Sequence, residues 1–189
     1  MKYDGIIIGG GPAGMLASIV AAQQGDNVLL FERNDRLGKK LLITGKGRCN
    51  VTNACSAQEV LQNIPRNSRF LYSAMENYPP SRIMEFFESH GCKLKVERGN
   101  RVFPVTDKSS SVLECLRNVM HRSGVQIRND RVQEILRDEK GVIGVKTGRE
   151  VVKAKWVILA TGGVSYPTTG STGDGYAMAQ ALGHTIVPA

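Results

Sequence analysis

Short runs of consecutive apolar residues, separated by glycines and polar turns, dominate the start of the chain. Tyr3 to Ile8 is one such run and ends at three glycines, and Asn27 to Phe31 is a second. Between them residues 12–24 have helical character, with Pro12 suited to the first turn and Gly25 to the end. Continuous apolar strands are typical of a parallel sheet covered on both faces. The pattern predicts a right-handed strand–helix–strand unit.

Further along the chain, predicted helices alternate with predicted strands. Residues 38–53 are polar, glycine-containing and aperiodic, which indicates a long ordered loop of the kind that a ligand justifies. The other predicted elements are a helix with a capping box at Ser56, a helix over Ser81–His90, a hairpin over Lys93–Phe103, a helix over Ser109–Arg122, a strand over Val125–Arg128, an antiparallel meander over residues 131–155 and a strand over Trp156–Ala160. This order predicts an α/β fold with a Rossmann-like parallel sheet, helices and an antiparallel β-meander.

The glycines after the first strand match a dinucleotide-binding pattern. Residues Gly9–Gly14 read G-x-G-x-x-G, after a predicted strand and at the start of a predicted helix. In that setting Gly9 allows the tight turn, Gly11 lets the backbone approach a pyrophosphate, and Gly14 lets helix and strand pack closely. The helix N-terminus offers N–H groups and partial positive charge to phosphates. The alternative is a glycine-rich turn that serves packing alone.

An acidic residue follows at the end of the second strand. Glu32 lies 18 residues beyond Gly14, where a carboxylate accepts hydrogen bonds from the ribose hydroxyls of adenosine and repels a phosphate on that ribose. The alternative is a solvated glutamate at a strand end.

The later part of the sequence favours FAD over NAD as the ligand. A meander followed by an apolar strand that ends in Ala160-Thr161-Gly162-Gly163 differs from a simple nicotinamide dehydrogenase, which continues with further strand–helix units. It resembles the flavoprotein disulfide reductases and fumarate reductases, in which an A-T-G segment returns the chain to FAD. Bare glycines there permit a close approach of backbone to cofactor.

Three stretches resemble a narrower family, the bacterial FAD-dependent flavoproteins of the YhiN and BaiN type. They are residues 9–14, residues 38–53 with the motif G-R-C-N-x-T-N, and residues 160–176. The resemblance covers essentially the whole chain and implies an FAD/NAD(P)-binding two-dinucleotide fold. Residues 1–189 would then be one FAD-binding domain, with a helical and hairpin excursion at about 55–105 and a meander at about 131–155. The resemblance also implies that this is the N-terminal portion of a longer chain whose C-terminal part is missing.

The resemblance further implies a set of cofactor-binding residues: Gly9, Gly11, Pro12, Ala13, Gly14, Glu32, Arg33, Lys40, Thr44, Gly45, Gly47, Arg48, Cys49, Asn50, Asn53, Val132, Thr161, Gly162, Gly163, Gly173 and Asp174. In this picture the first glycines hold the pyrophosphate and Glu32 the ribose, while Val132 offers its backbone to adenine. Lys40 and the loop from Thr44 to Asn53 run along pyrophosphate and flavin.

Side chains with reactive groups remain open to two interpretations. Lys46 and Arg48 sit among glycines and could neutralise a pyrophosphate, or they could form a solvated loop face. Cys49 has no partner at two-residue spacing, which favours a packing role over a dithiol relay. Tyr166 and His184 could donate protons to a reduced substrate, but packing is the stronger interpretation of both. The sequence names no catalytic acid.

Net charge and cysteine content limit which binding partners and which cellular compartment the sequence predicts. The formal charge of +8 predicts attraction to anions, but the basic stretch at residues 33–48 lacks interleaved aromatics, so we expect no nucleic acid. The four cysteines and three histidines show no metal-ligand spacing, so no metal is expected, and free thiols favour the cytoplasm. Residues 5–25 carry no charge, yet their glycines and Pro12 argue against a membrane span.

Together these observations predict an FAD-dependent oxidoreductase. NAD(P)H would supply hydride to the flavin, and the flavin would reduce a small organic acceptor, for which an activated C=C bond is the analogy-based choice. Two alternatives stay open, namely an FAD-dependent RNA-modifying protein and a non-catalytic flavin-binding module.

Overall fold

The computed structural model describes residues 2–187, and the chain divides into two compact units. The first unit combines Met1–Leu41 with Leu116–Ala189, and the second is Leu42–Cys115. Each unit is built around its own sheet or sheets.

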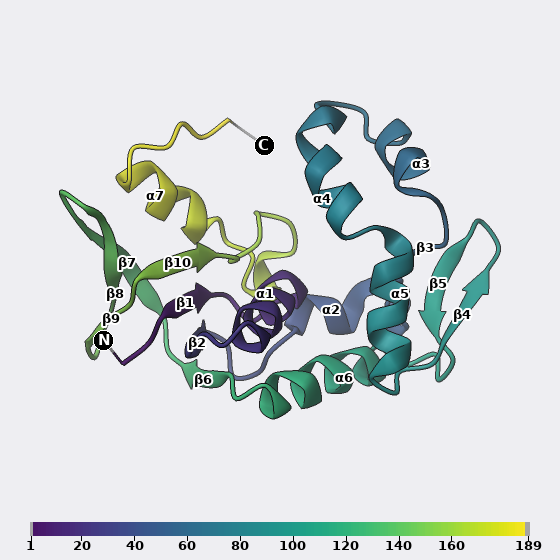
Figure 1. Cartoon of the computed structure of the whole chain (residues 1–189), viewed down its shortest axis with the longest axis horizontal. Coiled ribbons are helices and arrows are strands. Elements are labelled where there is room, and N and C mark those ends of the chain that lie inside the picture. The colour runs from purple at the N-terminus through teal and green to yellow at the C-terminus, as the bar shows by residue number, and fades with distance from the viewer. Residues whose placement is uncertain (1, 188–189) are drawn as a thin grey trace. The chain divides into compact units, whose positions relative to one another are not determined.

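A four-stranded parallel sheet organises the first unit (Figure 1). Its strands, in spatial order, are β10 (Trp156–Leu159), β1 (Gly5–Ile8), β2 (Val28–Glu32) and β6 (Gln126–Asn129). Ile8 pairs with Leu159 on one side and with Phe31 on the other, so three strands reach the same edge together. The predicted parallel sheet is confirmed, and the structure places β10 beside β1.

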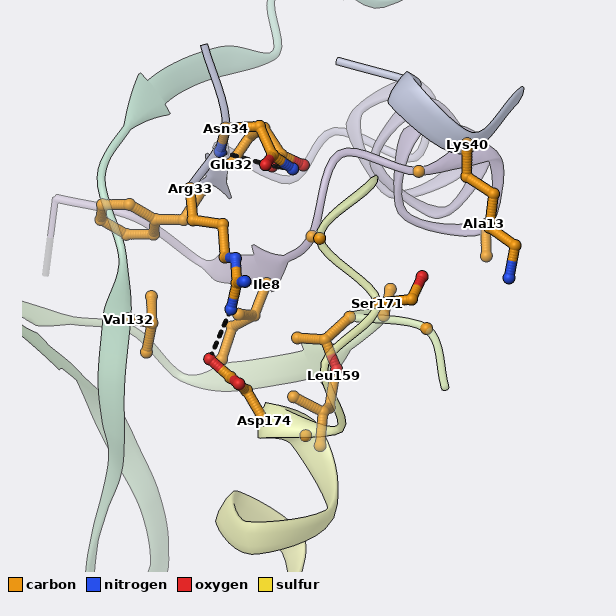
Figure 2. Close-up of a pocket in the computed structure, with 18 of the residues that line it drawn as sticks. Ile8, Ala13, Glu32, Arg33, Asn34, Lys40, Val132, Leu159, Ser171 and Asp174 are labelled. Atoms are coloured by element: carbon orange, nitrogen blue, oxygen red, sulfur yellow. Dashed lines mark hydrogen bonds and ion pairs between the residues drawn. The ribbon is translucent and has the colours of Figure 1, made fainter. Parts of the chain in front are cut away.

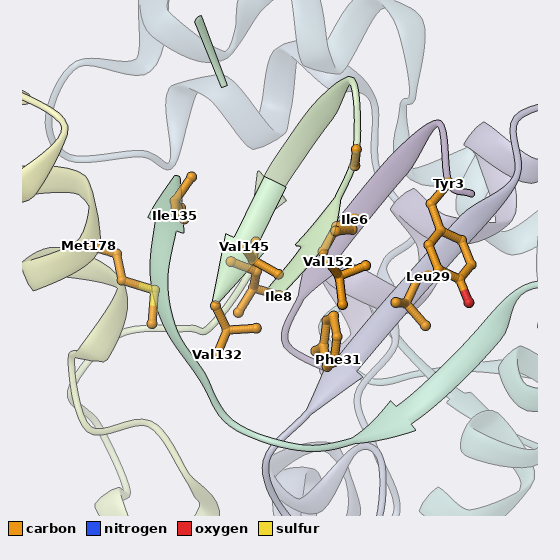
Figure 3. Packing of buried hydrophobic residues seen from close by; sticks show 11 residues of the cluster. Tyr3, Ile6, Ile8, Leu29, Phe31, Val132, Ile135, Val145, Val152 and Met178 are labelled. Atoms are coloured by element: carbon orange, nitrogen blue, oxygen red, sulfur yellow. The ribbon is translucent and has the colours of Figure 1, made fainter. Parts of the chain in front are cut away.

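Different elements cover the two faces of this sheet. Helix α1 (Pro12–Gln23) packs on β1 and β2, and a meander of β7 (Val132–Asp138), β8 (Gly141–Thr147) and β9 (Val151–Lys153) covers the other face. Figure 3 shows Ile6, Ile8, Leu29 and Phe31 packed with Val132, Val145 and Val152 from the meander. Side chains alternate along a strand, so the fully buried Ile7 and Leu30 face the α1 side.

The last elements of the first unit follow β10. A short 3-10 helix (Pro167–Thr169) precedes α7 (Asp174–Ala181), whose Met178 joins the core beside Ile135 (Figure 3). Helix α6 (Ser109–Arg122), which crosses the boundary between the units, ends before Gly124, at a φ of 75°. The predicted stop is confirmed because glycine adopts this left-handed conformation without steric cost.

The second unit combines short helices with a small antiparallel sheet. Its helices are α3 (Ala57–Gln62), a 3-10 turn (Ser68–Leu71), α4 (Tyr72–Asn77) and α5 (Pro80–Ser89), and its strands run in the order β3 (Thr52–Asn53), β5 (Arg101–Pro104) and β4 (Leu94–Glu97). The capping box at Ser56 is present, with Glu59 N–H donating to the Ser56 hydroxyl and the Glu59 carboxylate accepting from Ser56 N–H.

Residues 38–53 are not an uninterrupted loop. They contain α2 (Lys39–Ile43), which spans the boundary between the units, and a 3-10 turn (Thr44–Gly47). The prediction of an aperiodic loop was wrong here because a helix of five residues is too short to show a hydrophobic period. The same reason explains why α4 gave no usable signal.

Candidate functional site

A cavity of about 590 Å³ opens at the carboxyl edge of the parallel sheet, in the first unit. We call it the glycine-turn pocket. It lies where β1, β2 and β10 end, and its lining includes Gly9, Glu32 and Ala160 from the three strand ends. Crevices outside the carboxyl ends of parallel strands are the common ligand sites of open α/β sheets.

Two backbone turns from distant parts of the sequence meet in this pocket. A Cβ atom added to Gly9 would lie 2.4 Å from the carbonyl oxygen of Ala160 and 3.1 Å from the Cα of Thr161. Gly9 has a φ of 111°, which also excludes ordinary side chains. The Gly9 and Thr161 turns therefore come together at one edge of the sheet, in agreement with the resemblance to flavoproteins in which an A-T-G segment returns the chain to the cofactor.

The glycines of the first turn differ in what surrounds them. A Cβ on Gly14 would lie 1.9 Å from the carbonyl oxygen of Gly9, so helix and turn are in direct contact there. A Cβ on Gly11 would meet no atom within 4 Å, and Gly11 lines the pocket. Gly14 therefore serves packing, while Gly11 keeps space open next to the backbone.

The N-terminus of α1 suits an anion. The N-cap residue of α1 is Gly11, and no side chain of the described residues caps this end of the helix. Pro12 occupies the first turn, which holds no acidic residue. The first N–H groups of a helix have no partner inside the helix and carry partial positive charge. The open space beside the Gly11 backbone and the uncapped helix end both suit a pyrophosphate. The residues present therefore fit the phosphate part of a dinucleotide.

Glu32 is bound differently from the expectation. It is only 8% exposed, and its carboxylate accepts hydrogen bonds from Gly10 N–H at 2.7 Å and from the backbone and side-chain nitrogens of Asn34 at 2.7 and 2.6 Å. A carboxylate offers about four acceptor positions, so room for a ribose hydroxyl remains. Glu32 lines the pocket and also ties the glycine turn to the end of β2.

Several other predicted residues line the same pocket. Arg33 and Asp174 form an ion pair of 2.7 Å, and Figure 2 shows them facing each other on the side of Val132. Lys40 and Ala13 lie on the other side in Figure 2, and Lys40 Nζ donates to Ser165 Oγ at 2.5 Å. The predicted residues that line the pocket are Gly9, Gly11, Pro12, Ala13, Glu32, Arg33, Lys40, Val132, Thr161, Gly162 and Asp174.

Three predicted residues in the first unit are outside the lining. Gly14 lies under the turn, Gly163 lies close to the Tyr176 hydroxyl, and Gly173 precedes α7 in a left-handed conformation. The sequence did not single out Asn34 and Arg131, which also line the pocket. Asn34 carried no motif, and Arg131 gave no signal beyond its place at the start of the meander.

The remaining predicted residues, Thr44, Gly45, Gly47, Arg48, Cys49, Asn50 and Asn53, belong to the second unit. Residues 44–49 form a tight turn in which Cys49 N–H donates to the Thr44 carbonyl at 3.0 Å, and Asn53 ends β3. Gly45, Gly47 and Cys49 all have positive φ. Cys49 is buried, and burial raises the pKa of its thiol, so it stays protonated as the packing interpretation expects.

Arg48 is held by carboxylates of its own unit. It forms ion pairs with Glu97 and Asp107, and its guanidinium lies 4.1 Å from the centre of the Phe103 ring. Lys95 binds the same two carboxylates, with a Nζ to Asp107 oxygen distance of 2.6 Å. Two cations and two anions thus form a balanced cluster that joins the turn at residues 44–49 to the β4–β5 hairpin.

This cluster predicts a pH dependence. Hydrogen bonding from Arg48 lowers the pKa of Glu97, and hydrogen bonding from Lys95 and Arg48 lowers that of Asp107, below the ordinary values of 4.5 and 3.8. A carboxylate with a lowered folded-state pKa stabilises above its unfolded pKa and loses this contribution as pH falls through the folded one. When the pH is lowered below about 4, we expect the hydrogen-exchange protection factors of the amides in β4 and β5 to decrease.

The matched variant is Glu97→Gln, which keeps the shape of the side chain but cannot titrate. Its protection factors should be lower at pH 7 and should change less on acidification. Equal acid sensitivity in the variant and the parent protein would show that the cluster does not stabilise the hairpin.

Comparison with known proteins agrees with this geometry. The family described as "HI0933-like protein Rossmann domain" matches residues 3–189. The chain belongs to this family. The prediction of an FAD-binding Rossmann domain of the YhiN and BaiN type is therefore confirmed.

Two curated relatives of this HI0933-like chain carry named activities. It is 37% identical over 185 residues to the 3-dehydro-bile acid delta(4,6)-reductase of Clostridium scindens, a match that covers 96% of this chain and 44% of the relative. It is 31% identical over 188 residues to the ribosomal RNA dihydrouridine synthase of Escherichia coli strain K12, covering 99% and 46%. The chain therefore spans about half the length of these relatives.

Solved structures show the same fold. The 3-ketosteroid-delta4-(5alpha)-dehydrogenase from Rhodococcus jostii RHA1 superposes with a TM-score of 0.71 at 19% identity, covering 97% of this chain and 54% of that one. A flavocytochrome c3 fumarate reductase superposes with a TM-score of 0.67 at 25% identity, covering 95% and 40%.

Among the described residues, no helix is long and apolar enough to cross a membrane. Within the same residues, no cluster of three histidine, cysteine or acidic side chains is arranged to hold a metal ion.

Proposed function

We propose that this HI0933-like chain is the FAD-binding part of an oxidoreductase that takes electrons from NAD(P)H and reduces an activated carbon–carbon double bond in a small organic molecule. The observation that carries the proposal is the contact between the Gly9 and Thr161 turns beside the uncapped N-terminus of α1. Bound FAD would supply the redox chemistry by accepting electrons from a reductant and passing them to the acceptor.

The residues of the chain would bind and orient this cofactor. The first turn of α1, from Gly11 to Gly14, would hold the pyrophosphate with backbone N–H groups. Glu32 would fix the ribose, because its carboxylate still has acceptor capacity after binding Gly10 and Asn34. Lys40 would leave Ser165 Oγ, 2.5 Å away, to neutralise phosphate charge.

The names of similar proteins support reduction of a double bond. The bile-acid relative is a delta(4,6)-reductase, and one of the solved neighbours is a fumarate reductase. Both names describe the reduction of a C=C bond that lies next to a carbonyl or carboxylate group. The cysteines that the structure describes form no disulfide, which fits a reducing cytoplasm, and we include that location in the proposal.

Purified complete protein tests the proposal. We expect a yellow protein with a flavin absorption spectrum that NAD(P)H bleaches without oxygen, and we expect an α,β-unsaturated ketone to restore the colour. A saturated ketone of the same skeleton is the matched control and should leave the flavin bleached. Colourless protein that takes up no added FAD would refute FAD binding, and bleached flavin that no unsaturated acceptor reoxidises would refute the reaction.

The dihydrouridine synthase relative favours a second candidate, in which the double bond belongs to a uridine in RNA. The net charge of +8 would attract a polyanion. Under this candidate, RNA binding weakens steeply as salt rises and RNA reoxidises the flavin. Absence of RNA affinity at low salt would remove it and leave the small-molecule reductase.

A further inference from the structure

One carboxylate, that of Asp174, joins three elements at one end of the glycine-turn pocket. Its Oδ2 accepts from Arg33 Nη1 at 2.7 Å and from Arg131 Nη2 at 2.8 Å. Arg33 directly follows β2, Arg131 directly precedes β7, and Asp174 begins α7. Thr172 Oγ1 donates to the other oxygen of Asp174 at 2.5 Å. We call Arg33, Asp174 and Arg131 the clasp.

The clasp lies on the rim of the cavity and not elsewhere on the surface. All three side chains line the glycine-turn pocket, on the side where Figure 2 shows Val132 next to Arg33 and Asp174. Apolar side chains of Ile8 and Leu159 line the pocket close by. A flat aromatic base at this end would meet apolar surface together with planar guanidinium groups, which stack well on aromatic rings.

Asp174 is the shared counter-ion of two arginines. Its side chain is only 19% exposed, and hydrogen bonding from Thr172 and Arg131, with the positive charge of Arg33, lowers its pKa. Without this anion, two arginines would face each other with no shared counter-ion. The nearby Glu32 cannot replace it, because its carboxylate is directed to Gly10 and Asn34.

We propose that Asp174 is a positioning residue for the dinucleotide: by holding Arg33 and Arg131 together it closes the clasp over the adenosine half of FAD and sets how slowly the cofactor dissociates. This proposal rests on the proposed function, since it requires that the glycine-turn pocket binds FAD. It assigns Asp174 no contact with reacting atoms. Redox chemistry at the flavin half should therefore not depend on the clasp.

The test is the FAD dissociation rate of the holoenzyme, measured by rapid dilution into an excess of an apoprotein that binds FAD tightly and traps it. Asp174→Asn keeps the size of the side chain but removes its charge, and we expect FAD to dissociate about tenfold faster, because the ion pairs with Arg33 and Arg131 become weaker hydrogen bonds to a neutral amide. Removing an anion also strengthens the attraction of the bound pyrophosphate, which slows FAD dissociation, so faster FAD dissociation from Asp174→Asn would come from the loss of the clasp in spite of this attraction.

A matched control is available in the same unit. Asp138, the last residue of β7, lies outside the pocket lining, and its carboxylate accepts from Lys140 N–H at 2.8 Å. Asp138→Asn removes the same charge and should leave the FAD dissociation rate within about twofold. Salt gives a second readout: raising it should speed FAD release from the parent protein and have little effect on Asp174→Asn.

FMN, which lacks the adenosine half, separates the clasp from a general role in folding. The Asp174→Asn apoprotein should bind FMN with the same affinity as the parent apoprotein. Equal FAD dissociation rates in the Asp138→Asn and Asp174→Asn variants, or an equal loss of FMN and FAD affinity, would overturn the proposed role of the clasp. A parent protein that binds no FAD would instead refute the proposed function.

Discussion

Replacing Gly11 with valine is expected to abolish FAD binding while the fold stays intact. The added side chain meets no protein atom within 4 Å of its Cβ position and would stand in the space next to the α1 N-terminus. The backbone there has a φ of −76°, which any residue adopts. Loss of two charge-assisted hydrogen bonds to phosphate, about 3 kcal/mol, corresponds to at least a hundredfold weaker binding.

Fluorescence titration of the apoprotein with FAD measures this effect. Urea unfolding provides the control for folding, and we expect a cost of about 1 kcal/mol, since valine is a poor residue at a helix N-cap. A Gly11→Val protein with normal flavin content would show that the phosphates do not lie against this turn.

Replacing Gly14 with alanine is expected to lower the stability of the fold, whereas Gly11→Val lowers FAD affinity. Its Cβ would lie 1.9 Å from the Gly9 carbonyl oxygen, and a rigid backbone atom cannot move aside as a flexible side chain would. Overpacking of this kind costs about 3 kcal/mol. Thermal unfolding should show a Tm lower by roughly 6 to 12 °C.

Gly11→Ala is the matched control for this change, because it adds the same methyl group three residues away in open space. Its Tm should stay within about 3 °C of the parent value. Similar Tm values for the two alanine variants would mean that α1 does not press on the Gly9 turn as described.

The sheet and the glycine turns could be predicted from the sequence because their signals are local and strong. The apolar runs around Ile6 and Leu29 have the length of strands, and Gly9, Gly11 and Gly14 stand at spacings that a strand–turn–helix unit requires. The strand β10 followed from the apolar run that ends just before Thr161, whereas its place beside β1 is known from the structure. In each case one short stretch carried the whole signal.

The polar network of the site could not be predicted, because it depends on tertiary contacts. Arg131 and Asp174 are 43 residues apart in sequence, and nothing in either segment indicates the other. Glu32 was predicted as a ribose ligand, but its bonds to Gly10 and Asn34 depend on how the turn folds back on β2. Arg48 drew attention as a free cation among glycines, whereas Glu97 and Asp107 bind it.

The most direct test of the account is a crystal structure of the complete protein with FAD. The account predicts that the pyrophosphate oxygens lie about 3 Å from backbone N–H groups of the first turn of α1, with the Thr161–Gly162 segment in contact with the dinucleotide. FAD bound with its phosphates away from both turns would contradict it.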